Sequence, residues 1–181
     1  AHMDLRAAYE GFERSHASIF FNVLQQLPQV TRLVQVGVRD FSRDEVEVAR
    51  AQGERVVVHD GRALFQAKAR GRPFAEICDA ILAPLPPDVY VSFDIDGLDA
   101  PYCPHTGTPV PGGLSFDEAV FLIERLARSG RRIIGFDLCE VAPGPDGDEW
   151  DANVGARLLF KLCGALLVSA TLVSATLVPQ G

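Results

Sequence analysis

The stretch "DVYVSFDID", residues 88–96, joins a run of apolar and β-branched residues to an acidic end. A continuous run of this kind is typical of a strand buried on both faces, as in a parallel sheet. Three further stretches have the same character, at residues 32–38, 55–60 and 131–141. We therefore expect four strands that pair in parallel.

Helical patterns alternate with these strands. Residues 42–53 and 115–130 each begin at a serine with a glutamate three positions later, the pattern of a capping box, and each closes at a glycine. Apolar residues at helical spacing also mark residues 15–27, 73–85 and about 149–167. Alternation of strands and helices predicts an α/β fold with a parallel sheet, and no linker divides residues 1–181, so we expect a single domain.

Composition restricts the class of protein. The 181 residues are 48% hydrophobic and 23% charged, with a net charge of −7, which fits a globular domain and argues against nucleic acid as the main partner. The four cysteines form no C-x-x-C pair, so no zinc ribbon is expected, and reduced thiols suggest a cytoplasmic protein.

The C-terminal stretch "CGALLVSATLVSATLVPQG" is the nearest approach to a membrane-spanning segment. It carries "VSATL" twice, at 168–172 and 173–177, and serine and threonine recur through it. No apolar run reaches the roughly 20 residues that a membrane helix needs. We interpret the stretch as a buried helix or strand extended by a local duplication, and expect no membrane partner.

Two aspartates end the strand at 88–96. In open α/β sheets ligands bind outside the carboxyl ends of the strands. Asp94 and Asp96 are two positions apart, so in a strand they would share one face. Converging carboxylates repel each other and lose hydration, and a cation between them removes both costs. Helix capping with an arginine salt bridge remains the alternative from these two residues alone.

The opening "AHMDLR" adds His2 and Asp4, again two positions apart. At the end of a strand both would lie on one face. One imidazole and three carboxylates suit Mn²⁺ or a similar divalent ion better than Cu(I) or structural zinc, and bridging carboxylates suit a two-metal site. The competing interpretation is that the histidine and methionine are a cloning scar.

Three motifs together resemble the ureohydrolase family, which contains arginase, agmatinase and formiminoglutamase. "AHMDLR" resembles its Asp-Ala-His-x-Asp motif without the first aspartate, residues 92–115 resemble its second signature, and "GFDLCEVAPG" at 135–144 is similar to its third. The resemblance runs from residue 1 to about 164 and favours the agmatinase-like branch. It implies a three-layer α/β/α, arginase-like fold with a mainly parallel sheet, of which this chain would be the C-terminal portion.

The resemblance also implies a cofactor, two manganese ions held by six residues. Four of the six have counterparts here, namely His2, Asp4, Asp94 and Asp96, with Asp94 bridging both ions. The other two ligands in the family are an upstream histidine and the aspartate before the position of Ala1, so a chain that starts at Ala1 is expected to lack them.

Three further roles follow from the same resemblance. His16 matches a histidine near the mouth of the site that moves protons, a task suited to a group that titrates near neutrality. Glu140 matches the glutamate that grips the guanidinium group, and Thr108 matches a threonine lining the substrate pocket. Asp4 would orient the attacking water. The alternatives are a solvent-exposed histidine and a loop-capping glutamate. Cys103 and His105 receive no role.

The implied function is a metal-dependent ureohydrolase, a C–N hydrolase acting on linear amidines. It would release urea and an amine from a small cationic guanidino substrate such as agmatine, in polyamine metabolism, as a homo-oligomer. Hydrolysis of formiminoglutamate or guanidine at the same site is one alternative. A non-catalytic subunit with the same fold, or an inactive fragment, is the other.

Overall fold

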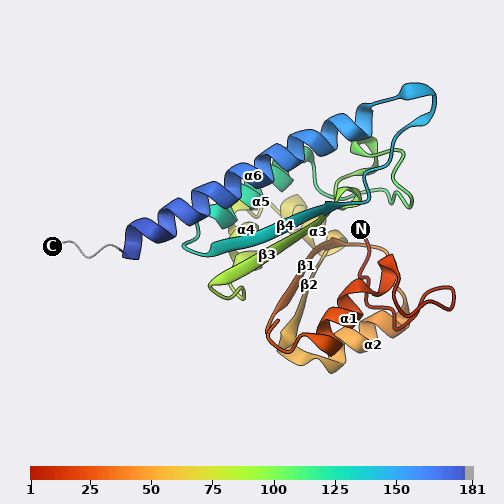
Figure 1. The fold of residues 1–181 in the computed structure, drawn as a ribbon, viewed down its shortest axis with the longest axis horizontal. Coiled ribbons are helices and arrows are strands. Elements are labelled where there is room, and N and C mark those ends of the chain that lie inside the picture. The colour runs from red at the N-terminus through yellow and green to blue at the C-terminus, as the bar shows by residue number, and fades with distance from the viewer. Residues whose placement is uncertain (178–181) are drawn as a thin grey trace. The chain divides into compact units, whose positions relative to one another are not determined.

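The computed structural model describes residues 1–177, which form two compact units, Ala1–Arg72 and the residues from Pro73 onward. Each unit contains a two-stranded parallel sheet with helices packed against it (Figure 1). The expected α/β class and parallel pairing are therefore present in both units. The prediction of a single domain is not tested by this division and stays a prediction.

The first unit is built on strands β1 (Leu33–Val38) and β2 (Val56–Asp60), which pair in parallel. Its helices are α1 (Ile19–Gln26), α2 (Arg43–Ala51) and α3 (Gly61–Ala69), with short 3₁₀ turns at His16–Ser18 and Gly53–Arg55. Its buried core consists of Met3, Leu5, Leu24, Val38 and Val56. The opening residues of the chain thus contribute directly to this core.

The second unit is built on strands β3 (Asp88–Asp94) and β4 (Arg132–Cys139), which also pair in parallel. Its helices are α4 (Phe74–Leu82), α5 (Phe116–Ala127) and α6 (Trp150–Leu177), with 3₁₀ turns at Ile95–Gly97, Ala100–Tyr102 and Pro145–Gly147. Each strand follows a helix and ends at a loop. The loops after β3 and β4 therefore leave the same edge of the sheet.

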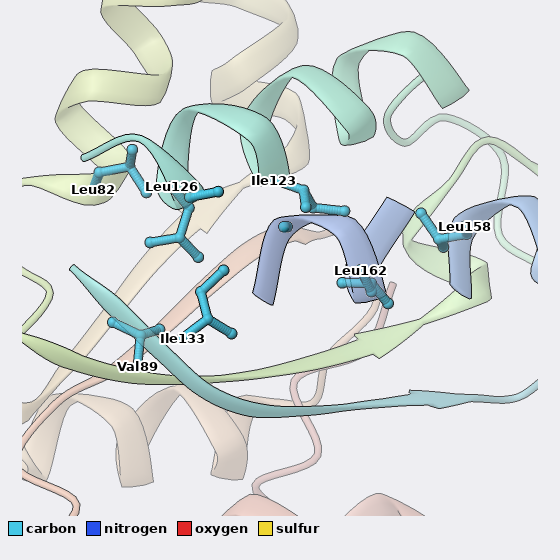
Figure 2. Close-up of a cluster of buried hydrophobic side chains, with 9 residues drawn as sticks. Leu82, Val89, Ile123, Leu126, Ile133, Leu158 and Leu162 are labelled. Carbon is cyan, nitrogen blue, oxygen red and sulfur yellow. The ribbon is translucent and has the colours of Figure 1, made fainter. Parts of the chain in front are cut away.

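The core of the second unit lies between its helices and one face of the β3–β4 sheet (Figure 2). Val89 and Ile133 point from the strands toward Ile123 and Leu126 of α5. Neighbouring strand residues point the other way, and Tyr90 and Ile134 are 57% and 56% exposed. Among the described residues of the second unit, the helices pack on one face of β3 and β4, so these strands are not buried on both faces as expected.

Local signals placed most helices correctly. Both predicted capping boxes are present, with the serine and glutamate exchanging hydrogen bonds at Ser42–Glu45 and Ser115–Glu118. The sequence did not reveal α3, which begins directly after β2 where Asp60 Oδ1 accepts the N–H of Ala63 at 2.8 Å. One aspartate both ends the strand and caps the helix, so no loop residues separate the two patterns.

Helix α6 is longer than expected because both VSATL copies continue it. One stripe of it is buried against β4 and α5, while Leu159, Phe160 and Leu167 on its other side are exposed. Residues Trp150–Ala175 are long and apolar enough to cross a membrane, with a mean hydropathy of 2.0. The expectation that no apolar run is long enough for a membrane helix is therefore wrong by length and composition, and 22% of this window is buried. One such helix is weak evidence of a membrane span, so the expected lack of a membrane partner stays a prediction.

Ser169 joins α6 to the start of β4 and provides a stability test. Its hydroxyl accepts the N–H of Ile133 at 3.1 Å and donates to the Leu166 carbonyl at 2.9 Å, with the side chain fully buried. Ser169→Ala leaves a buried N–H without its acceptor. We expect the free energy of unfolding to fall by about 1–3 kcal/mol, measured by urea denaturation.

The duplication supplies a matched control. Ser174 has the same place in the second VSATL copy, is exposed, and donates to the Ala170 carbonyl of its own helix. Ser174→Ala should change the free energy of unfolding by less than about 0.5 kcal/mol. Equal effects of the two substitutions would contradict the anchoring role of Ser169.

Candidate functional site

The residues predicted to form the site are divided between the two units. His2, Asp4 and His16 belong to the first, and Asp94, Asp96, Thr108 and Glu140 belong to the second. Within residues 1–177 no group of three or more His, Cys, Asp or Glu side chains is arranged to hold a metal ion. The four-ligand set therefore stays a prediction.

The opening segment is built into the first unit. The carbonyl of Ala1 accepts the N–H of Arg39 at 2.8 Å, and the N–H of Leu5 donates to Glu45 Oε1 at 3.1 Å. The side chains of Ala1, Met3 and Leu5 are buried. Such packing is expected of a segment that belongs to the domain, whereas an appended tag is normally poorly ordered.

His2 and Asp4 do not share a regular strand, contrary to expectation. His2 makes an isolated parallel bridge with Asp40, and its Nε2 lies 3.8 Å from Asp40 Oδ2. Asp4 is buried with a φ of +54°, in the left-handed region that non-glycine residues rarely adopt. Its carbonyl accepts the N–H groups of Phe20 and Phe21 at 3.1 and 3.3 Å. Capping α1 in this way holds the strained backbone in place.

His16 is exposed at the start of the 3₁₀ turn His16–Ser18. Its ring meets the ring of Tyr9 edge to face, with centroids 5.3 Å apart. The guanidinium of Arg6 lies 5.3 Å from the centre of the same tyrosine ring. The imidazole therefore contacts an aromatic ring and is exposed to solvent, and its role in proton transfer stays a prediction.

Asp94 and Asp96 lie at the carboxyl end of β3, but not both in the strand. Asp94 is its last residue, whereas Asp96 belongs to the 3₁₀ turn Ile95–Gly97 and is 1% exposed. Burial raises the pKa of Asp94 to about 6, and the carboxylates of Asp96, Glu140 and Asp137 add to this shift. These acids of the second unit are thus close enough to disfavour one another's charge, a cost that a cation offsets.

Glu140 follows β4 and faces the loop that follows β3. Its φ is +63°, and its carbonyl accepts the hydroxyl of Thr106 at 2.8 Å. A Cβ atom at Gly107 would lie 3.9 Å from Glu140 Oε2, so the glycine lies next to the carboxylate. Thr108 is the next residue of this loop and is exposed. The structure thus brings the predicted Glu140 and the segment that contains Thr108 together.

Sequence reasoning missed the interaction that joins the loop after β3 to the start of α6. The backbone N–H of His105 donates to Asp151 Oδ2 at 3.0 Å, and its ring Nδ1 is hydrogen-bonded to Asp151 Oδ1 at 2.9 Å. Asp151 is fully buried at the start of α6, and Trp150 Nε1 donates to the Pro101 carbonyl at 3.0 Å. The acidic stretch at 143–157 was the available signal, but no spacing rule links it to His105.

Acidic side chains follow both strands at one edge of the sheet in the second unit. Asp96 is buried, Asp94 is partly buried, and Glu140 is exposed beside Gly107. Carboxylates are the ligands that hard divalent metal ions prefer, and an exposed carboxylate suits an organic cation.

Comparison with known proteins identifies relatives over nearly the whole chain. A family model described as the arginase family matches residues 1–164. N(1)-aminopropylagmatine ureohydrolase of Thermus thermophilus is 39% identical over 165 residues, covering 91% of this chain and 51% of the relative. Agmatinase of Pyrococcus horikoshii is 35% identical over 164 residues, covering 91% and 52%.

A solved structure agrees with these sequence matches. Proclavaminate amidino hydrolase from Streptomyces clavuligerus superposes with a TM-score of 0.77 at 26% identity, covering 93% of this chain and 54% of that chain. This likeness confirms the predicted α/β, arginase-like fold. The chain spans about half the length of the curated relatives it matches. Because the family model covers residues 1–164 of 181, the chain belongs to the arginase family.

Proposed function

We propose that the protein is a manganese-dependent hydrolase that cleaves a C–N bond of a linear guanidino compound, releasing urea and an amine. The observation that carries this proposal is that Asp94, Asp96 and Glu140 follow β3 and β4 at the same edge of the sheet, where Asp96 and Glu140 help to raise the pKa of Asp94. Membership in the arginase family and the names of the two relatives, an agmatinase and an aminopropylagmatine ureohydrolase, support it.

The donor chemistry suits manganese. Asp96 is buried and Asp94 partly buried, and a divalent cation would offset the cost of their charges. His2 and Asp4 would complete a mixed nitrogen and oxygen set of the kind that Mn²⁺ accepts. When bound, manganese would supply an acidified water as the nucleophile at neutral pH.

The remaining roles belong to the chain's own residues. Glu140 would bind the guanidinium through paired, charge-assisted hydrogen bonds, and the Thr108 hydroxyl would line the same pocket. Asp4 would accept a hydrogen bond from the attacking water and so orient it. The exposed His16 would donate a proton to the departing amine. The net charge of −7 favours the approach of a cationic substrate.

The names of the two relatives suggest agmatine and its aminopropyl derivative as candidate substrates of this protein. Formiminoglutamate or guanidine hydrolysis would use the same groups. A non-catalytic protein with the same fold is the second candidate function, and it is favoured because no group of three His, Cys, Asp or Glu side chains within residues 1–177 is arranged to hold a metal ion. A cytoplasmic location and a homo-oligomer complete the proposal.

Metal binding is tested at Asp94. Asp94→Asn in the 181-residue chain removes a charged ligand, and we expect the affinity for Mn²⁺, measured by isothermal titration calorimetry, to fall at least about tenfold. Asp117→Asn makes the same change at an exposed position of α5 and should leave the affinity unaltered. Unchanged Mn²⁺ binding by Asp94→Asn would remove the metal assignment.

Substrate binding is tested at Glu140. The Mn²⁺-loaded chain is assayed for urea with agmatine, aminopropylagmatine, arginine and guanidine, and for formamide with formiminoglutamate. Glu140→Gln should lower kcat/KM about tenfold or more through loss of a charge-assisted pair, whereas the exposed Glu149→Gln should not. A chain that binds Mn²⁺ but releases neither product would support the non-catalytic alternative and contradict the hydrolase.

A further inference from the structure

An open cavity of about 530 Å³ lies between α4 and α5 in the second unit. Three arginines, two acids and an aromatic ring line most of it, namely Arg125, Arg128, Arg131, Asp79, Glu124 and Phe121. A volume of this order is typical of sites for small ligands. None of these residues has a role in the proposed hydrolysis.

The cavity lies at the opposite end of the β3–β4 sheet from the acidic residues. Its lining comes from the C-terminal parts of α4 and α5 and from the segment after α5, which lead into the amino ends of the strands. Asp94 is the last residue of β3 and Glu140 directly follows β4, so both lie at the carboxyl ends. The seven residues of β3 span about 20 Å between the two ends.

One of the three arginines is already neutralised. Arg125 donates to both carboxylate oxygens of Asp79, at 2.7 and 2.6 Å, and these hydrogen bonds hold the pKa of the Asp79 carboxyl below its usual value. Glu124 lies 3.6 Å from the ammonium group of Lys161 on α6. Both acids of the cavity therefore have cationic partners, and neither is left to neutralise the other two arginines.

Arg128 and Arg131 carry the uncompensated charge. Arg131 is held in place by backbone carbonyls, donating to Leu85 at 3.0 Å and to Ala83 at 3.4 Å. Arg128 is exposed, and its side chain makes no hydrogen bond or ion pair with residues 1–177. Two positive charges thus face one cavity in a chain whose net charge is −7.

We propose that this cavity binds the phosphate group of a small metabolite through Arg128 and Arg131. A guanidinium presents planar N–H groups that match phosphate oxygens, and two such charges match a dianion better than a single carboxylate. Phe121 is 41% exposed and its ring packs against Phe74, with centroids 5.9 Å apart. This ring offers an apolar wall for a base or other ring attached to the phosphate.

The test uses the metal-free 181-residue chain and calorimetric titration with pyrophosphate, ADP and adenosine at low ionic strength. We expect both phosphates to bind, with affinities that fall as salt is added, and adenosine not to bind. If ADP binds more tightly than pyrophosphate, the ligand of the cavity is a nucleoside phosphate. If the two bind equally, the cavity recognises the phosphate group alone. Adenosine binding as tightly as ADP, or no binding by either phosphate, overturns the proposal.

The variant Arg128→Gln tests whether phosphate binds in this cavity. It removes one charge-assisted contact from an exposed side chain, so the thermal midpoint should be unchanged while phosphate affinity falls about tenfold. Arg157→Gln makes the same change on α6, outside the cavity, and should leave the affinity as it is. Equal affinities of the two variants would show that phosphate binds elsewhere and would overturn the proposal.

Discussion

Parallel pairing of β3 with β4 is the constraint on which the candidate site depends. The register sets Asp94 opposite Cys139, so Glu140 follows on the neighbouring strand at the same edge of the sheet. Val89 and Ile133 at the other end of the strands are buried under α5 and α6, and one irregularity of the pairing, between Val89 and Tyr90, separates them from the regular register that runs from Tyr90–Gly135 to Asp94–Cys139. A shift of one residue within that regular stretch would turn its side chains to the opposite face of the sheet, so the position of Glu140 beside Asp94 depends on it.

Hydrogen bonds connect the loop after β3 to Glu140 and to the start of α6, and they define the surface at that edge of the sheet. Asp151, buried at the start of α6, holds both the backbone and the ring of His105, and Thr106 next to it holds the carbonyl of Glu140. Removal of a buried carboxylate partner is costly, so this link rigidifies loops that would otherwise be the mobile part of the unit. Positions that bind a substrate benefit from such support, because less entropy is lost when the ligand arrives.

Two of the predicted site residues have a left-handed backbone without being glycine. Asp4 and Glu140 have φ values of +54° and +63°, and in each case the carbonyl of the strained residue is hydrogen-bonded, to α1 and to Thr106 respectively. Strain of this kind costs of order 1–3 kcal/mol and persists where the surroundings over-determine it. Glu10 and Asp146 have the same conformation without a predicted role, so the functional roles of Asp4 and Glu140 stay predictions.

The sequence by itself determined the strands, the capped helices at Ser42 and Ser115, and the acidic motifs, because these depend on local periodicity and on spacings of two to four residues. Tertiary structure alone decided that Asp96 lies beyond its strand in a 3₁₀ turn, and that α3 follows β2 without a break. It also decided the His105–Asp151 link and the charge balance of the arginine cavity. These last two features depend on contacts between residues about forty or more positions apart, such as His105 with Asp151 and Asp79 with Arg125. No local sequence pattern predicts a contact between such distant segments.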